Sequence, residues 1–238
     1  DGGSCSGSII SPNGLMITNH HCAYGDIHAL STPEKNYLEV GFWAMKIEDE
    51  IPIKGKSVTF LRGVSDVTDL VNKIIDSLDA AGPRGLFFMN RVSSVIDKKF
   101  EGSPYEKSLS SMWRGSKYYL YFYETYSDVR LAGAPPVSVG AFGGETDNWG
   151  WPQHKGDFAI YRVYSAPDGK PAAYSKDNVP MAAKRYLPVS TKGVNPNDFT
   201  MVLGYPGRTN RYSSSFEVKE KFEILNPVIS GVRRAKLE

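Results

Sequence analysis

Residues 5–22 read CSGSIISPNGLMITNHHC, and this stretch decides the fold that the sequence predicts. Two short apolar segments lie on either side of a turn, in which Pro12, Asn13 and Gly14 are residues that favour chain reversal. Apolar segments separated by such a turn are typical of a β-hairpin. The sequence therefore predicts an antiparallel pair of strands that ends at two adjacent histidines and a cysteine.

The composition is that of an ordinary globular protein. The chain has 238 residues, of which 41% are hydrophobic and 23% charged, enough to bury a sizeable core. Its formal net charge of +2 is small and its basic residues are scattered, so no nucleic-acid partner is expected. No run of 18 apolar residues occurs, so no membrane insertion is expected. Because the chain starts at Asp1 without a Met or a signal peptide, we interpret it as a portion of something longer.

The next part of the chain predicts two more strands and then a helical insertion. Residues 51–64 favour two strands around a Lys-Gly turn. Residues 65–102 favour two helices, because their apolar residues recur at helical spacing. The first of these helices can be capped by Ser65 or Asp66 and can end at Gly82.

Three later segments predict strands again. Residues 117–136 are dense in aromatics and alternate well enough for a long hairpin. Residues 157–172 predict a strand followed by a Pro-Asp-Gly turn, and residues 197–212 predict another strand. After about residue 213 the sequence becomes charged and helical, which we interpret as a domain boundary.

The histidine pair allows three interpretations. His20 and His21 can be ordinary polar residues at a strand end, or they can bind zinc together with Cys22 and His28. Adjacent residues on an extended chain point to opposite faces, so the two histidines do not easily share one ion. No second Cys-x-x-Cys or His-x-x-x-His pair supplies further ligands, and we expect no metal. The third interpretation, a catalytic base, depends on the surrounding motif.

The order of hairpin, histidine and cysteine resembles the first barrel of the chymotrypsin-like serine peptidases. This resemblance implies that His21, directly before the cysteine, is the catalytic base. It also implies that Cys5 and Cys22, 17 residues apart, form a disulfide beneath that base. His20 stands where the common motif has alanine, and no role is assigned to it. A base of this kind needs a carboxylate to orient it, and Asp157 at the start of a strand is the best candidate.

The motif GGETDNWGWPQHKGDFAIYRVY, residues 143–164, makes the resemblance narrower. Together with TNHHC, DVRLAGAPP and LGYPGRTNRY, it resembles the bacterial dipeptidyl peptidases 7 and 11 over about residues 2–212. These are exported serine exopeptidases of the chymotrypsin clan in Gram-negative bacteria. The resemblance implies that Asp157 is the carboxylate of the triad, ahead of its rivals Asp147 and Asp198.

The resemblance also implies a site for the free amino group of the substrate, formed by Asn148 and Trp149. The chemistry fits, because an amide oxygen accepts from an ammonium and an indole face attracts that cation. The expected substrate is an oligopeptide with a free N-terminus, and no metal or organic cofactor is expected. Gln153, His154 and Lys155 stand where we expect Arg-His-Thr, and this departure puts neither site in doubt.

For the architecture, the resemblance implies a mainly β protein built on a chymotrypsin-like β-barrel. Residues 1–190 would form the first barrel of a double barrel, with the helical insertion at about 65–102. Residues 191–213 would open the second barrel, and residues 214–238 would begin an inserted helical domain. The expected location is the periplasm or cell surface of a Gram-negative bacterium, where a disulfide persists. A homodimer is left open for the full-length protein.

No convincing G-x-S-G motif for a nucleophilic serine occurs in the chain. GSCSG at residues 3–7 has the letters, but it lies in the predicted hairpin. The resemblance puts the serine beyond the inserted helical domain, so the chain is expected to carry the His and Asp of the triad and to be inactive alone. In the full-length enzyme we expect His21→Ala to abolish dipeptide release and His20→Ala to retain appreciable activity. A non-catalytic trypsin-like binding module is the alternative.

Overall fold

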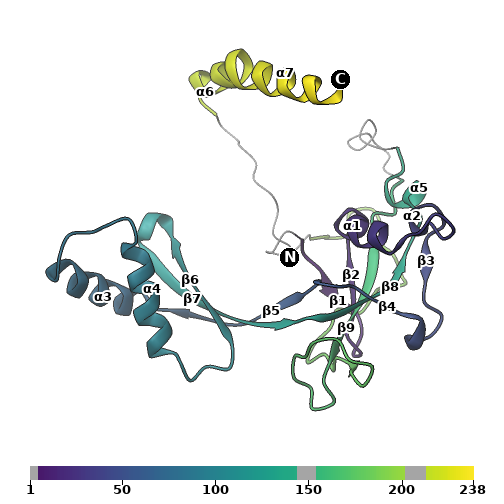
Figure 1. Ribbon diagram of the computed structural model, residues 1–238, viewed down its shortest axis with the longest axis horizontal. Coiled ribbons are helices and arrows are strands. Elements are labelled where there is room, and N and C mark those ends of the chain that lie inside the picture. Colours follow the sequence, from purple (N-terminus) through teal and green to yellow (C-terminus); the bar gives the residue numbers. More distant parts are fainter. Residues whose placement is uncertain (1–4, 144–153, 202–212) are drawn as a thin grey trace. The chain divides into compact units, whose positions relative to one another are not determined.

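The computed structural model describes residues 5–143, 154–201 and 213–238. The chain divides into two compact units, residues 1–197 and residues 198–238, and each is described by itself (Figure 1). The first unit contains two antiparallel sheets with their helices, whereas the second contains helices. The described part is thus mainly β with several helices, which confirms that part of the fold prediction.

A seven-stranded antiparallel sheet carries the N-terminal hairpin. Its path runs β1-β2-β9-β8-β3, with β10 beside β9 and β4 beside β8. The predicted hairpin is confirmed, because Ser8 of β1 pairs with Ile17 of β2. Gly14 in its turn has φ +68°, and a Cβ there would lie 2.6 Å from the Val163 carbonyl oxygen, so only glycine fits. The strands are β1 (Ser8–Ile9), β2 (Leu15–Thr18), β3 (Phe42–Trp43), β4 (Ile51–Pro52), β8 (Asp128–Ala134), β9 (Ala159–Ser165) and β10 (Val179–Pro180).

This sheet does not close into a barrel within the described residues. Its path begins at β1 and ends at β3, and no pairing joins those two strands. Both are two residues long, which is too short to extend a ladder of hydrogen bonds around a cylinder. The described residues therefore form an open sheet rather than the closed barrel expected for residues 1–190.

Helices cover the seven-stranded sheet and bury its core. Helix α1 (His20–Leu30) packs against β9 through Ala23 and Ile27, both fully buried with Ala159 and Tyr161. Alanine in both elements allows a close approach of helix and strand, and removing such apolar surface from water stabilises the contact. The other short helices here are α2 (Tyr37–Val40), η1 (Ile47–Asp49) and α5 (Val137–Gly140).

A second sheet of three strands, in the order β5-β7-β6, forms a separate region with two helices over residues 58–126. We call residues 58–126 the three-stranded region. Its core is a cluster of apolar side chains that includes Val71 of α3 and Val92 and Ile96 of α4, all fully buried. Its elements are β5 (Val58–Asp66), α3 (Thr68–Ala80), α4 (Phe88–Lys99), β6 (Glu106–Met112), η2 (Trp113–Gly115) and β7 (Lys117–Tyr126).

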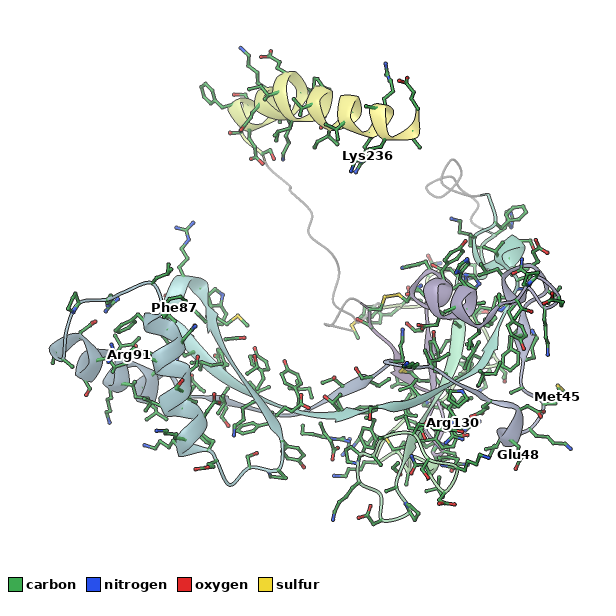
Figure 2. The ribbon with its side chains drawn as sticks, viewed as in Figure 1. Met45, Glu48, Phe87, Arg91, Arg130 and Lys236 are labelled. Carbon is green, nitrogen blue, oxygen red and sulfur yellow. A yellow bond between two sulfur atoms is a disulfide. The ribbon has the colours of Figure 1, made fainter. Side chains whose placement is uncertain are left out.

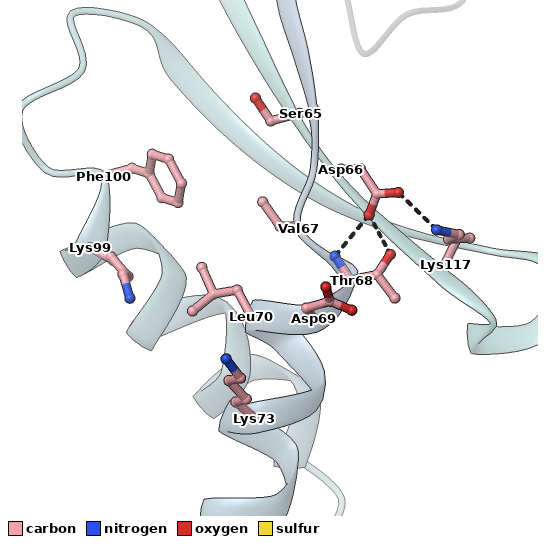
Figure 3. A pocket seen from close by; sticks show the side chains of 10 residues that line it. All are labelled: Ser65, Asp66, Val67, Thr68, Asp69, Leu70, Lys73, Lys99, Phe100 and Lys117. Atoms are coloured by element: carbon pink, nitrogen blue, oxygen red, sulfur yellow. Dashed lines mark hydrogen bonds and ion pairs between the residues drawn. The ribbon is translucent and has the colours of Figure 1, made fainter.

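Helix α3 begins at Thr68 and its N-cap residue is Val67, so neither Ser65 nor Asp66 occupies the cap position that the sequence predicted. The Asp66 carboxylate accepts a hydrogen bond from the Thr68 backbone N–H at 3.0 Å (Figure 3). It also forms an ion pair with Lys117 of β7, at 3.0 Å. Together these bonds hold the pKa of Asp66 at about 2, with those from Thr68 the largest cause. The start of the helix is thus tied to the neighbouring strand.

The hairpin predicted over residues 117–136 is wrong in its pairing. β7 pairs with β5 and β6, whereas β8 pairs with β9, β3 and β4. Only Ser127 lies between β7 and β8, and a one-residue connection is too short for a chain reversal. The chain instead continues from the three-stranded sheet directly into the seven-stranded one (Figure 1).

The second unit contains the helices predicted after about residue 213. They are α6 (Ser215–Glu220), the π-helical η3 (Lys221–Leu225) and α7 (Asn226–Leu237). The strand predicted over residues 197–212 is absent from residues 198–201, where Phe199 and Met201 are exposed and no described strand pairs with them. The rest of that segment lies outside the described residues. None of the helices that the structure describes has both the length and the apolar character needed to cross a bilayer.

Candidate active site

Helix α1 begins at His20, directly after β2, so the two histidines do not end an extended strand as predicted. The N-cap residue Asn19 makes no side-chain hydrogen bond to the helix backbone. Instead the Asp157 carboxylate accepts from the His21 backbone N–H at 3.0 Å. A carboxylate at a helix start satisfies a free N–H group and complements the helix dipole. A residue far along the chain therefore caps α1, which is why the local pattern did not reveal the helix.

The same carboxylate also holds the His21 ring. Its Oδ2 atom lies 2.8 Å from His21 Nδ1, and a carboxylate only accepts, so Nδ1 carries the proton. In the neutral ring this leaves Nε2 free to take up a proton. The His21 side chain is 71% exposed, whereas that of Asp157 is 27% exposed, so the ring opens to solvent while its partner is partly covered. This is the arrangement that a general base requires.

Asp157 stays ionised because its hydrogen bonds outweigh its burial. Burial raises the pKa of this carboxyl, but the hydrogen bonds from the His21 backbone and ring lower it, and the pKa is lowered overall. Asn19 adds a hydrogen bond from its Nδ2 atom to Asp157 Oδ2 at 3.3 Å. The ionised carboxylate therefore remains an acceptor for the His21 backbone N–H and for the proton on Nδ1.

The two cysteines form the disulfide that the resemblance implied. Cys5 and Cys22 have Cα atoms 6.2 Å apart and close a loop of 17 residues around the hairpin (Figure 2). Cys22 directly follows His21 on the first turn of α1. The bond ties that turn to the segment before β1, and constraining such a loop stabilises the folded chain.

A second contact, which the sequence analysis missed, holds the far end of α1. The Tyr161 hydroxyl on β9 donates to Asp26 Oδ2 at 2.6 Å, and Lys56 pairs with the same carboxylate at 2.9 Å. Burial, with Asp26 beside it, raises the pKa of the Tyr161 hydroxyl. Tyr161 lies four residues after Asp157, so alternation along β9 was the signal that could have found it. Asp157 and Tyr161 thus hold α1 at two points.

His20, to which the sequence assigned no role, is buried with 1% of its surface exposed. Its Nε2 atom lies 3.1 Å from the Pro135 carbonyl oxygen. A carbonyl only accepts, so Nε2 of His20 carries a proton and donates. The two histidines therefore face different partners, His20 the interior and His21 the solvent.

The remaining sequence-predicted site residues lie outside the described residues or in the second compact unit. Asn148 and Trp149, proposed to bind the substrate amine, lie outside the described residues, as does the rival carboxylate Asp147. Asp198, the other rival, belongs to the second compact unit. Across the described ranges, no group of three or more His, Cys, Asp or Glu side chains is placed to hold a metal ion.

Comparison with known proteins shows the family of this chain. The family model described as Peptidase S46 matches residues 1–238. The chain belongs to the peptidase S46 family. Dipeptidyl-peptidase 7 of Capnocytophaga gingivalis is 48% identical over 225 residues, which are 94% of this chain and 32% of that protein. An Asp/Glu-specific dipeptidyl-peptidase of the same organism is 43% identical over 231 residues, 97% of this chain and 32% of that protein.

A solved structure of an S46 relative is also similar. The crystal structure of Porphyromonas endodontalis DPP11 in complex with the dipeptide Arg-Asp matches with a TM-score of 0.83 and 39% identity. The match covers 95% of this chain and 33% of that one. The chain therefore spans about a third of the length of the S46 proteins it resembles.

Proposed function

We propose that the full-length protein containing this chain is a serine dipeptidyl peptidase, which releases dipeptides from the free N-terminus of oligopeptides. The observation that carries this proposal is the 2.8 Å contact between His21 Nδ1 and Asp157 Oδ2 beside an exposed imidazole. Membership of the S46 family supports the same reaction, because the relatives are named dipeptidyl-peptidases.

In this proposal His21 is the general base. Its Nε2 atom takes the proton from a serine hydroxyl while that oxygen attacks the peptide carbonyl. The same nitrogen then gives the proton to the leaving amine, and it later activates the water that releases the dipeptide from the serine. Asp157 keeps the proton of the neutral ring on Nδ1 and stabilises the imidazolium in each step. No metal or organic cofactor takes part.

The nucleophilic serine comes from outside this chain in our proposal. The 238 residues contain no convincing G-x-S-G motif, so the chain by itself would not turn over peptide. We assign residues 1–190, which include the open seven-stranded sheet, to the first-barrel part of a chymotrypsin-like fold. Residues 191–213 then open the second barrel, and residues 214–238 begin the inserted helical domain.

The restriction to dipeptides requires a group that holds the substrate's amino end at a fixed distance from the serine. We assign this role to Asn148 and Trp149, whose amide oxygen and indole face suit an ammonium. Dipeptidyl-peptidase 7 and the Asp/Glu-specific dipeptidyl-peptidase resemble this chain to a similar degree, at 48% and 43% identity. We therefore propose that parts of the protein outside this chain determine which substrate residue is preferred beside the cleaved bond.

The disulfide supports an exported protein. Disulfides such as Cys5–Cys22 persist in oxidising compartments, so we propose the periplasm or the cell surface of a Gram-negative bacterium. A homodimer is part of this proposal for the full-length protein.

The proposal is tested by incubating the full-length protein with a decapeptide and with its N-acetylated form, and by identifying the products by mass spectrometry. We expect successive dipeptides from the free peptide and none from the acetylated one, because acetylation removes the ammonium. Equal cleavage of both would show an endopeptidase. Binding of the peptide without any cleavage would show a non-catalytic binding module.

A further inference from the structure

We propose that His20 is a positioning residue for the catalytic pair, an inference that rests on the proposed function. Its buried ring fixes helix α5 against α1, and α5 in turn fixes the backbone that presents Asp157 to His21. The following contacts, all between described residues, carry this inference.

The His20 ring is held on two sides by the segment that contains α5. Its Nε2–H donates to the Pro135 carbonyl, 3.1 Å away. The ring also lies against Gly140, because a Cβ placed at that glycine would meet His20 Cγ at 2.4 Å and Cδ2 at 2.6 Å. No side chain fits between the ring and the helix, so this position requires glycine.

Helix α5 then contacts the backbone just before Asp157. The Gly156 N–H donates to the Val139 carbonyl at 3.0 Å. A Cβ at Gly156 would lie 2.8 Å from Val139 Cγ1, so the Val139 side chain also packs directly against the Gly156 backbone. Displacing α5 therefore displaces the residue that precedes the catalytic carboxylate.

Asp157 in turn contacts α1, so the series of contacts that starts at His20 ends on the same helix. Its carboxylate accepts from the backbone N–H and from the ring of His21, the residue directly after His20. His20 therefore contacts the α5 end of this series of contacts, and His21 contacts its Asp157 end. His21 has the reacting nitrogen, and His20 sets where its carboxylate partner lies.

This role differs from that of an ordinary core residue, because a misplaced carboxylate slows the proton transfer without weakening peptide binding. Shifts of about 1 Å in catalytic geometry cost up to about 100-fold in rate. The expected signature of a His20 substitution is therefore a lower kcat with an unchanged KM, measured per active site.

The experiment uses the full-length protein and compares His20→Ala, His20→Gln and Gly140→Ala, with exposed His28→Ala on the same helix as the control. The kcat and KM for dipeptide release are measured, together with the rate at which a fluorophosphonate labels the serine. The amount of labelled enzyme counts the folded active sites, so loss of folded protein does not count as loss of rate. Circular dichroism checks that each variant folds.

We expect His20→Ala and Gly140→Ala each to lower kcat and the labelling rate by about 10- to 100-fold, with KM within about 3-fold. His20→Gln should recover most of the rate, because its amide nitrogen can donate to the Pro135 carbonyl from a similar distance along the side chain. His28→Ala should match the wild type. The double variant His20→Ala/Gly140→Ala should be no slower than the worse single variant, since both substitutions disturb the same contact between the His20 ring and Gly140.

A wild-type rate per active site in His20→Ala, or a loss confined to KM, would overturn this inference. Additive losses in the double variant would also overturn it. Failure of the proposed function would give a result that differs from failure of this inference. The wild-type protein would then release no dipeptides, and the fluorophosphonate would label no serine.

Discussion

The seven-stranded sheet with α1 and the three-stranded region differ in the internal contacts that stabilise each of them. The first is joined by polar contacts between residues distant in sequence, such as His21 with Asp157 and Asp26 with Tyr161. Of the buried polar side chains in the described ranges, all but Thr68 lie outside the three-stranded region. They include Arg130, whose ion pair with Asp128 is buried in the sheet (Figure 2).

The three-stranded region instead depends on an apolar core between two helices and a local sheet. Two of its ion pairs, Asp79–Arg84 and Asp66–Lys117, lie at the surface, and a third, Arg62–Glu124, is partly buried. Nonpolar packing gives stability without placing reactive groups, whereas a buried polar network fixes the direction of particular side chains. We therefore expect that the geometry of the proposed catalytic pair and the stability of the three-stranded region can be changed independently of each other, and each of the following predictions tests this separation.

The largest expected effect is on the catalytic side of the comparison. Asp157→Asn in the full-length protein should lower kcat by about 10⁴-fold, because the amide no longer favours the tautomer and the charge that His21 needs. Hydrogen exchange of peptides from residues 68–99 should not change. Faster exchange there would show that the two regions are not separable.

Ile96→Ala tests the other side of the comparison. Ile96 is fully buried on α4, and removing its side chain should destabilise the three-stranded region by about 2–5 kcal/mol. Hydrogen exchange of α3 and α4 should therefore accelerate, while kcat per active site stays unchanged. Val95→Ala is the matched control, since Val95 is 40% exposed and its substitution should cost less than about 0.5 kcal/mol. A fall in kcat for Ile96→Ala would contradict the separation.

Removing the disulfide should lower the local stability of the seven-stranded sheet and α1 alone. Closing a loop of 17 residues contributes about 3 kcal/mol, so Cys5→Ser/Cys22→Ser should accelerate hydrogen exchange in β1, β2 and the start of α1. Peptides from the three-stranded region should be unaffected. Mass spectrometry of the non-reduced wild type should first recover the linked Cys5–Cys22 peptides, and recovery of two free thiols would contradict both the bond and the exported location.

The smallest expected effect concerns Asp66, whose pKa in the folded chain is about 2. The folded pKa lies below the ordinary value of 3.8, so the stabilisation is present above about pH 4 and is lost as the pH falls towards 2. Exchange of the first turn of α3 should therefore accelerate between about pH 4 and pH 2 relative to intrinsic rates, more in the wild type than in Asp66→Asn. An equal response in the two proteins would show that this carboxylate does not stabilise the helix start.

The same comparison explains which features the sequence could predict. The hairpin at residues 5–22 and the helices of the three-stranded region follow from local spacing and turn residues, and the structure contains them. The start of α1 does not follow from local spacing, because the group that caps it is Asp157 and not a residue nearby in the sequence. The strands β7 and β8 were found but paired wrongly, since periodicity indicates a strand and not its partner.

The candidate site divides in the same way. The pairing of His21 with Asp157 was expected from the resemblance, and the structure places them 2.8 Å apart. Tyr161 and His20 were missed, because a buried tyrosine or histidine has no local signature apart from its place on a strand or helix. Their roles depend on partners distant in the chain, Asp26 for one and Pro135 for the other.

The most direct test of the central claim, that His21 is the base oriented by Asp157, compares dipeptide release by the full-length wild type, His21→Ala and His20→Ala. We predict that His21→Ala loses at least about 10⁴-fold in kcat. We predict that His20→Ala retains measurable activity between the other two. A His21→Ala protein that retains activity within about 10-fold of the wild type, or that exceeds His20→Ala, would contradict the account.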